Sequence, residues 1–437
     1  MVVTGRLATA GAVVALFVVF VMPTWLGVAM MTSALAAAVL IDMGSVARPH
    51  DVSLSREPLT VVRLGRSAEV ELVVLNSGTR TVRGTLWDDW PDSARAAHRA
   101  HRLDLAHNTR TRLHTTLTPT YRGDRAAGPV TLRLIGPLGI AGRQTRRLVP
   151  ARVRALPPFR SEHLMQSKVK RLQHLEGRNV ANLRGQGTEF DSFREYVPGD
   201  DVRSIDWRAT ARASDVLVRT WRPERNRHML MLLDTGRVSA GRVGSPEHID
   251  DGTRLDASIE AALLLGGLAA AAGDSVDLLA FDRKVRAEVR GVGGKGLQLK
   301  LMHAMAGISP ALVDTDSAGM VRATIQRTRR RSLVVWFTSL DGAAVQENLL
   351  PVLPVLAQRH RVLIVSVTDP EIAAAAARRD TLADLYLAAT AETILAERAL
   401  VQDSLRRKGI AVVSAPPDRL PEALADEYLE LKQSGTM

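Results

Sequence analysis

The chain has 437 residues, an apolar fraction of 46% and a formal net charge of +12 at pH 7. This length allows two folded domains, and the composition is that of a globular protein. Because the chain contains no cysteine, disulfide bonds and thiolate metal sites are excluded.

The first predicted elements are two membrane-spanning helices. No charged residue interrupts residues 7–41, and as one helix this run would measure about 52 Å against a hydrocarbon core of roughly 30 Å. Pro23 and Trp25 lie in the middle of the run, and proline breaks a helix. We therefore expect short spans over residues 7–22 and 24–41, so that residues 1–42 form a transmembrane helical hairpin.

A tight hairpin returns the chain to the side of the membrane on which it began. Both flanks are basic, with Arg6 before the spans and Arg48 and His50 after them. Positive residues favour the cytoplasmic side, so we expect a cell-membrane protein with the bulk of its chain in the cytoplasm. The alternative is an export signal peptide with Arg6 as its charged end and a cleavage site near residues 34–36, which predicts an exported protein.

Residues 51–158 are expected to form an immunoglobulin-like β-sandwich. Apolar residues alternate with polar ones, as in Val70, Leu72 and Val74, and turn residues separate short strands. The strands are predicted at residues 59–64, 68–75, 80–86, 110–117 and 130–135.

The same region is strongly basic. Residues 51–160 contain nineteen arginines and no lysine, against nine aspartates and glutamates. After a membrane anchor, this charge favours contact with anionic lipid headgroups. A basic nucleic-acid-binding protein is a second alternative, but the sequence offers it no motif and no aromatic platform.

Residues 161–225 connect the two predicted domains through a helix over residues 161–177 and a dense run of charges. In this run Pro198 and Gly199 signal a turn, and Asp200 or Asp201 is placed to cap a helix over residues 202–212. Acids alternate with arginines, so most charges can pair within the run. We expect an ion-pair and capping network that braces the domains; a partner-binding surface is the alternative. Carboxylates among arginines stay ionised and make poor general acids, which disfavours catalysis.

Residues 226–437 have the pattern of a doubly wound α/β domain. Apolar strands are predicted at residues 229–233, 276–281, 333–337, 362–367 and 410–413, and helices at residues 255–272, 297–305, 318–328, 345–358 and 391–408. Continuously apolar strands separated by helices indicate a parallel sheet covered on both faces. Ligands of such folds bind at the carboxyl ends of the strands, which directs attention to Asp234 and to residues 338–341.

Enzyme motifs are missing from the sequence. The glycine-rich residues 291–296 lack the spacing of a phosphate-binding loop. The eleven histidines show no metal-ligand spacing, and there is no G-x-S-x-G nucleophile elbow. We therefore expect a protein that is not an enzyme and has no catalytic residues.

Three motifs in the charged run resemble the signature of the bacterial family catalogued as domain of unknown function 58. They read G-x-G-x-E-F, P-G-D-D-x-R and I-D-W-x-x-T-A-R, and the signature and interaction positions are Gly185, Gly187, Glu189, Phe190, Arg194, Tyr196, Gly199, Asp200, Asp201, Arg203, Asp206, Trp207, Thr210 and Arg212. The resemblance implies a membrane-anchored protein with a C-terminal von Willebrand factor A-like domain. It also implies a scaffold or adaptor that works with a MoxR-type AAA+ ATPase, and with other membrane proteins encoded nearby, in the assembly or maturation of protein complexes. An exported, adhesion-like protein of the von Willebrand A type is the alternative.

The resemblance also implies a place for a metal ion. Von Willebrand A-like domains can hold Mg²⁺ through D-x-S-x-S after the first strand and an acid after a later strand. Asp234 is present here, but Gly236 and Val238 replace the two serines. Leu340 stands where the later acid is expected, and Asp341 lies one residue away.

The site that such domains use to hold Mg²⁺ is called the metal-ion-dependent adhesion site, and the sequence has a degenerate form of it. Asp234 and Asp341 are its only acidic candidates. Mg²⁺ requires a nearly octahedral set of oxygen ligands, so we expect no firmly bound cofactor. Arg237 is expected to act as the cation of the pocket instead and to pair with a carboxylate of the partner.

Overall fold

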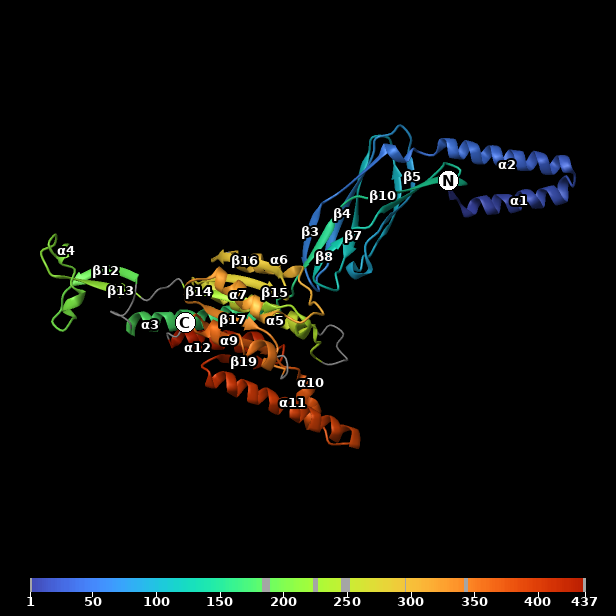
Figure 1. Cartoon of the computed structure of the whole chain (residues 1–437). Coiled ribbons are helices and arrows are strands. Elements are labelled where there is room, and N and C mark those ends of the chain that lie inside the picture. The colour runs from blue at the N-terminus through green and yellow to red at the C-terminus, as the bar shows by residue number, and fades with distance from the viewer. Residues whose placement is uncertain are drawn as a thin grey trace. The chain divides into compact units, whose positions relative to one another are not determined.

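A computed structural model of the chain describes residues 2–182, 189–222, 227–244, 252–294, 296–341 and 345–434. The chain divides into two compact units, Met1–Pro158 and Phe159–Met437 (Figure 1). The signature glycines Gly185 and Gly187 lie outside the described residues.

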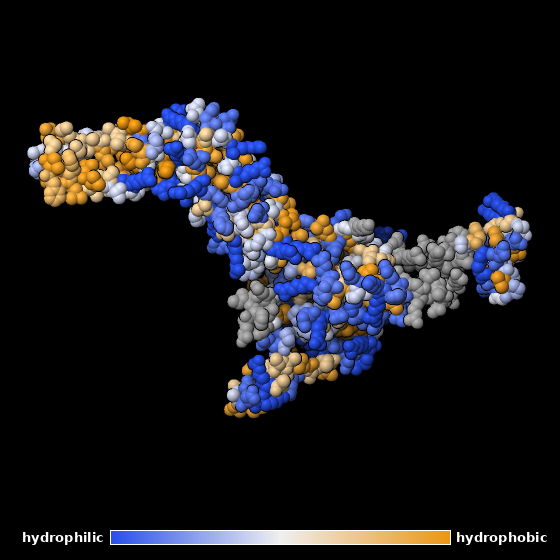
Figure 2. Space-filling view, turned by 180° about the vertical axis from the view of Figure 1, so that it is seen from behind, coloured by the Kyte–Doolittle hydropathy of each residue, from blue (hydrophilic) through white to orange (hydrophobic). Residues whose placement is uncertain are grey.

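The first unit begins with two apolar helices, α1 (Gly5–Val21) and α2 (Trp25–Ser45). They separate at Pro23, as its missing N–H predicts. Their surfaces are apolar (Figure 2), with Phe20 78% and Trp25 90% exposed. By length and composition, the helix that begins at Trp25 is long enough to cross a membrane, whereas α1 is shorter.

The remainder of the first unit is mainly antiparallel β-structure in three sheets. The five-stranded sheet has the order β1-β10-β9-β5-β6, with bounds Val2–Val3, Ala141–Arg147, Val130–Ile135, Val82–Asp88 and Ala100–Leu105. The second sheet, β2-β4-β7, contains Val52–Arg56, Ala68–Asn76 and Arg110–Leu117. The third sheet, β3-β11-β8, contains Leu59–Arg63, Arg152–Leu156 and Gly123–Ala126, and its pair β3-β11 is parallel.

The alternating pattern predicted the strands of this unit only where the inward side chains are aliphatic. Val70, Leu72 and Val74 are buried as expected. The strands β2, β6, β8, β10 and β11 were not predicted. In β10, for example, Ala141–Arg147 contains three arginines and no large apolar side chain, so its sequence lacks the strand pattern.

Both ends of the α1–α2 pair attach to the turn between β9 and β10. Before α1, Thr4 Oγ1 donates to the carbonyl of Gly139 at 2.5 Å. Near the end of α2, the buried Asp42 carboxylate accepts three backbone N–H groups of residues 138–141 at 2.8–2.9 Å. The helical pair therefore leaves the β-structure and returns to it at one place.

The second unit contains a six-stranded sheet of order β16-β15-β14-β17-β18-β19. The strands in this order are Val285–Val292, Ser275–Phe281, His228–Asp234, Leu333–Phe337, Arg361–Val367 and Ala411–Ala415. Five of them are parallel, but β16 runs antiparallel to β15. The five predicted strands are therefore parallel, as expected. The edge strand β16 was not predicted, and it runs antiparallel because the chain reverses directly after β15 instead of crossing over through a helix.

Helices cover both faces of this sheet (Figure 1). The second unit contains the helices α3 (Met165–Asn182), α5 (Arg254–Ala271), α6 (Leu297–Ala306), α7 (Ser317–Arg327), α9 (Leu353–Ala357), α10 (Pro370–Ala377), α11 (Leu382–Arg407) and α12 (Leu420–Gln433). Of these, α3 packs against α5 and α12, and α10 packs against α11. On β14, Leu230 and Leu232 join the core under α7 and α9, whereas Met231 points to the opposite face, toward Gly266 of α5.

The single helix expected over residues 345–358 is also wrong. It is replaced by a π-helical turn, Val345–Leu349, and the short helix α9. Pro351 and Pro354 explain the break, because each lacks the N–H that a continuous helix requires.

Candidate functional site

The signature residues fold into a two-stranded hairpin of β12 (Glu189–Glu195) and β13 (Leu217–Arg222). Between the strands lie a 3₁₀ turn, Val202–Ser204, and the one-turn helix α4, Trp207–Thr210. The expected continuous helix over residues 202–212 is wrong. Ile205 pairs with Val218 of β13 in an isolated β-bridge, so the chain is extended between the two turns.

Two ion pairs hold the hairpin together. The Arg194 guanidinium donates to both carboxylate oxygens of Asp200, at 2.7 and 2.5 Å. Asp206 caps α4 by accepting the N–H groups of Arg208 and Ala209 at 2.9 Å, and it accepts Arg219 Nε at 2.6 Å. These contacts hold the pKa values of both carboxyls below their usual range, chiefly through Arg194 for Asp200 and the Ala209 N–H for Asp206.

Some of the predicted pairing and capping contacts therefore exist, but each of them joins two residues of the hairpin, so they do not brace one domain against the other. The sequence missed Arg219, because thirteen residues separate it from Asp206 and only the pairing of β12 with β13 brings the two together. The backbones of Glu189 and Phe190 pair with those of residues 222 and 221.

Other signature residues shape the loops of the hairpin. Gly199 has a positive φ of 111°, which suits glycine at the turn. Asp201 caps the 3₁₀ turn through the Arg203 N–H at 2.9 Å. Thr210 Oγ1 accepts the Leu217 N–H at 3.0 Å. The backbone N–H groups of Tyr196 and Arg212 donate to the carbonyls of Val216 and Ala209, respectively.

The hairpin exposes large apolar side chains beside arginines. Trp207 is 66% exposed and Val202 is 61% exposed. A surface hollow of about 310 Å³ is lined by Arg203, Ser204, Ile205, Asp206, Trp207 and Arg219. Among the described residues, Arg203 and Arg208 form no ion pair.

A second candidate lies at the carboxyl edge of the six-stranded sheet. The strand order reverses between β14 and β17, and such a switch point is where doubly wound folds bind ligands. Asp234 ends β14 there and is buried. Its carboxylate accepts Thr315 Oγ1 at 2.5 Å, Thr338 Oγ1 at 2.8 Å and the Gly236 N–H at 2.9 Å. Burial raises the pKa of Asp234, and these hydrogen bonds offset the increase only in part.

Thr315 explains the glycine at position 236. A Cβ atom on Gly236 would lie 2.1 Å from Thr315 Oγ1, far inside van der Waals contact. The threonine hydroxyl therefore occupies the space that a serine at position 236 would need, and it binds Asp234 itself.

Asp341, the second predicted acid, lies between two arginines. Arg254 Nη1 approaches Asp341 Oδ2 at 2.5 Å, and Arg398 Nη2 approaches Oδ1 at 2.8 Å. Burial raises the pKa of Asp341, but the two arginines and Ser339 outweigh it, so the net shift is downward. The sequence did not identify either arginine as part of the site.

These two acids do not fit a Mg²⁺ site. The oxygens of Asp234 face hydroxyl and N–H donors, and those of Asp341 face guanidinium groups. Within the described part of the chain, no three acidic or histidine side chains are grouped closely enough to hold a metal ion.

The expectation that Arg237 is the cation of the pocket is wrong. Arg237 pairs with Asp314 at 2.9 Å, and both side chains are mostly exposed. Arg254 lines the hollow beside Asp234 instead. Arg254 is the first residue of α5, and this helix start places its side chain over the end of β14.

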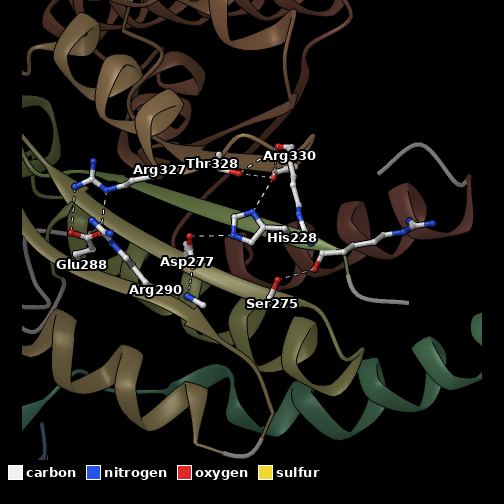
Figure 3. A network of polar contacts seen from close by, with 11 residues as sticks. His228, Ser275, Asp277, Glu288, Arg290, Arg327, Thr328 and Arg330 are labelled. Atoms are coloured by element: carbon white, nitrogen blue, oxygen red, sulfur yellow. Dashed lines mark hydrogen bonds and ion pairs between the residues drawn. The ribbon is translucent and has the colours of Figure 1, made fainter. Parts of the chain in front are cut away.

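His228 and Asp277 lie side by side near the amino ends of β14 and β15 (Figure 3), and His228 also contacts Ser332. His228 Nδ1 contacts Ser332 Oγ at 2.8 Å, and Nε2 contacts Asp277 Oδ2 at 3.1 Å. Ser332 is only 4% exposed, and its hydroxyl lies 3.0 Å from the carbonyl of Arg330. A buried hydroxyl with such a partner is not available as a nucleophile, so the group is structural.

Asp234→Asn tests the state of the buried acid. Because the folded-state pKa is raised, the folded protein retains the proton more strongly than the unfolded chain, and stability falls as pH rises from about 4 through the folded pKa. The asparagine variant should lack this fall and be the more stable protein at pH 7. Melting temperatures from pH 4 to pH 8 measure the difference; parallel curves for the two proteins would contradict the assignment.

Comparisons with known proteins agree with the signature. The family model described as "Protein of unknown function DUF58" matches residues 192–413. Uncharacterized protein Rv1480 of Mycobacterium tuberculosis is 29% identical over 202 residues, which cover 45% of this chain and 60% of that protein. Uncharacterized protein Mb1516 of Mycobacterium bovis matches to the same extent. The match therefore spans less than two thirds of these relatives.

Solved structures give weaker similarities. A PapD-like domain of human CEP192 aligns with a TM-score of 0.20 and 16% identity, over 25% of this chain and 89% of that one. The Vibrio cholerae VesB protease aligns with a TM-score of 0.17 and 9% identity, over 24% of this chain and 32% of that one. At these scores neither structure informs the fold.

Proposed function

The chain belongs to the family described as "Protein of unknown function DUF58", and from this premise we propose that it is a non-enzymatic, membrane-anchored adaptor. Its partner in this proposal is a MoxR-type AAA+ ATPase, and its role is the assembly or maturation of protein complexes. The partner class comes from the family resemblance. The surface that we assign to it is the signature hairpin.

The exposed face of the hairpin is the observation that carries the proposal. In each of its two ion pairs, an arginine and an aspartate neutralise one another. These four residues therefore do not require a charged partner outside the hairpin. Trp207 and Val202 nevertheless remain largely exposed. Trp207 and Arg203 also line a hollow of about 310 Å³. Exposed apolar groups rimmed by polar residues are typical of interaction sites, and tryptophan and arginine dominate binding energy at interfaces.

The α1–α2 pair supports a membrane anchor. At 1.5 Å per residue, the 17 residues of α1 and the 21 residues of α2 measure about 26 and 32 Å, close to the thickness of the hydrocarbon core. Their shared attachment to the β9–β10 turn supports an arrangement with both ends on one side of the membrane. We propose a two-span hairpin that leaves the rest of the chain in the cytoplasm.

The fold of each unit is part of the proposal. The β-structure of the first unit is proposed to be an immunoglobulin-like sandwich, because buried aliphatic side chains of different sheets share one core. The second unit is proposed to be von Willebrand factor A-like, because Asp234 ends the first strand, in chain order, of the six-stranded sheet and lies at the switch point of that sheet.

Replacement of Trp207 tests the adaptor surface. Trp207→Ala should weaken capture of a co-encoded, nucleotide-free AAA+ ATPase by about thirtyfold, because a central tryptophan is worth about 2 kcal/mol or more at an interface. The measurement is the Kd for the full chain in lipid nanodiscs. Trp87→Ala is the matched control, because Trp87 is a 47% exposed tryptophan of the first unit. Equal affinity of the Trp207 variant and the native protein would reject the hairpin as the docking surface.

Reporter fusions test the proposed sidedness. A fluorescent protein fused after Pro158 should be active, whereas alkaline phosphatase at the same position should be inactive, because it folds only after export. The reverse result would favour the exported alternative and remove the ATPase from the proposal.

A further inference from the structure

We propose that the base of the α1–α2 pair, where both helices join the β-structure, binds the headgroup of an anionic phospholipid through a cluster of arginines. The basal cluster consists of Arg6, Arg48, Arg80, Arg133 and Arg147. The proposal rests on the membrane anchor of the proposed function, but not on the ATPase. Three observations carry it: the position of the cluster along the helical pair, the acceptors that hold its arginines, and the acids that fail to neutralise it.

The basal cluster lies at the end of the helical pair at which the chain enters and leaves the apolar segment. Arg6 directly precedes the uncharged residues 7–41, and Arg48 follows shortly after α2 ends at Ser45. At this base the apolar surface of the helices gives way to hydrophilic residues (Figure 2). Because each helix is about as long as the hydrocarbon core is thick, the cluster lies at the height of the lipid phosphates when the pair spans the membrane.

Backbone carbonyls, rather than carboxylates, hold three of these arginines. All of the acceptors belong to residues at or beside the basal ends of α1 and α2. They are the carbonyls of Gly44 and Val46 for Arg80, of Val3 for Arg133, and of Pro49 and Val52 for Arg147. A carbonyl fixes the position of a guanidinium group without cancelling its charge, and it leaves other N–H donors of the group for a second acceptor.

Acids do not neutralise the basal cluster. Within the described ranges of the chain, its arginines form no ion pair. The acids of the same region are already engaged, since Asp42 is buried and accepts three backbone N–H groups, and Asp51 lies 3.2 Å from His50. Even with both acids counted, positive charge is in excess. Arg6, Arg48 and Arg80 are exposed, so an anion can reach this excess.

The arginines at the other end of the first unit are different. There Asp124 accepts Arg154 Nε at 2.6 Å and lies 3.6 Å from Arg152, so an acid of the protein already offsets much of the charge. We therefore assign the lipid to the basal cluster and not to the basic β-structure as a whole.

A phospholipid fits the base better than a free anion. Guanidinium groups match the oxygens of a phosphate, and the acyl chains of the lipid can pack beside the apolar surface of α1 and α2, which a free phosphate cannot do. Phosphatidylcholine would bring its own cation close to the arginines, whereas phosphatidylglycerol has none. The base should therefore prefer the anionic lipid when the acyl chains are identical.

Native mass spectrometry of the full chain in detergent micelles tests this preference, because it resolves each bound lipid by its mass. The protein is titrated with phosphatidylglycerol and with phosphatidylcholine that carry the same acyl chains. The first phosphatidylglycerol should bind at least tenfold more tightly than the first phosphatidylcholine. The difference should decrease as the ionic strength increases, and inorganic phosphate at the concentration of the lipid should not displace it.

Variants locate the binding at the basal cluster. Arg48→Gln should weaken the binding of phosphatidylglycerol about fivefold, whereas Arg48→Lys, which keeps the charge, should retain most of the affinity. Arg66→Gln is the matched control, because it removes the charge of an exposed arginine just before β4. The base lies at the opposite end of this strand, about 30 Å away, where Asn76 donates to the Arg80 carbonyl. The control variant should bind both lipids like the native protein.

Four results would overturn the proposal. They are equal affinity for the two lipids, an unchanged affinity for phosphatidylglycerol in Arg48→Gln, an equal loss of affinity in Arg66→Gln, and displacement of the lipid by inorganic phosphate. The last result would identify a free anion as the ligand. Because the comparison of the two lipids uses the native protein, it decides the proposal even if a variant is unstable.

Extraction of membranes with alkaline carbonate distinguishes these results from a failure of the anchor. Release of the chain would reject the anchor and the lipid site together. A chain that stays in the membrane but binds both lipids equally would reject the lipid site alone and leave the proposed adaptor intact.

Discussion

Asp88→Ala should lower the free energy of unfolding of the first unit by about 3–5 kcal/mol, the cost of leaving a buried charge without its partner. Asp88 on β5 forms an ion pair with Arg56 on β2, and both side chains are fully buried. Burial lowers the pKa of Arg56 to about 10, so the guanidinium is still charged at neutral pH when its partner is removed.

The surrounding contacts explain why the effect should be large. Trp90 Nε1 and Thr115 Oγ1 donate to the second oxygen of Asp88, at 3.1 and 2.7 Å. Arg56 also donates to the carbonyl of Val149 at 2.8 Å. The group joins β2 and β7 of one sheet to β5 of another, so the variant loses a link between sheets as well as a charge.

Hydrogen exchange of the β5 peptides in increasing urea, measured on the full chain, reports the stability of this unit. Asp104→Ala is the matched control, because the Arg83–Asp104 pair on β5 and β6 is 55% and 72% exposed. Exposed pairs contribute about 0–1 kcal/mol. If the Asp88 and Asp104 variants are destabilised equally, the buried pair does not carry the stability assigned to it.

The two sets of strands show what could be predicted from the sequence. The strands β14, β17 and β18 are continuously apolar, because both faces of the sheet are covered, and their positions were predicted within two residues. The edge strand β16, Val285–Val292, contains three charged side chains and lacks that pattern. The hairpin strands β12 and β13 were missed as well, because charged residues interrupt the apolar pattern in both sequences.

In the candidate site, the sequence predicted the residues that directly follow a strand, but it did not predict their partners from distant parts of the chain. Asp234 and Asp341 were found because each follows an apolar strand. Their partners are distant: Thr315 lies 81 residues from Asp234, and Arg254 lies 87 residues from Asp341. Spacing along the chain cannot reveal such pairs, so Arg237 was chosen as the cation in place of Arg254.

Gly236→Ser should destabilise the second unit by about 1–3 kcal/mol, the usual cost of inserting atoms into a packed site. The new Cβ would lie 2.1 Å from Thr315 Oγ1 and 2.8 Å from the carbonyl of Val313. Gly307→Ser is the control, because a Cβ there meets no atom within 4 Å, and its effect should stay within about 0.5 kcal/mol.

The double variant Gly236→Ser with Thr315→Ala identifies the cause of that loss. Thr315→Ala removes the main clash and the hydroxyl that donates to Asp234. We expect the new serine hydroxyl to replace that donor. The loss in free energy of unfolding of the double variant should therefore be about 0.5–3 kcal/mol smaller than the sum of the losses of the two single variants. This is the range of coupling energies between residues in contact. Urea unfolding of the four proteins completes the cycle. Additive effects would mean that Thr315 does not occupy the place of the motif's serine, and the absence of that serine would then need another physical cause.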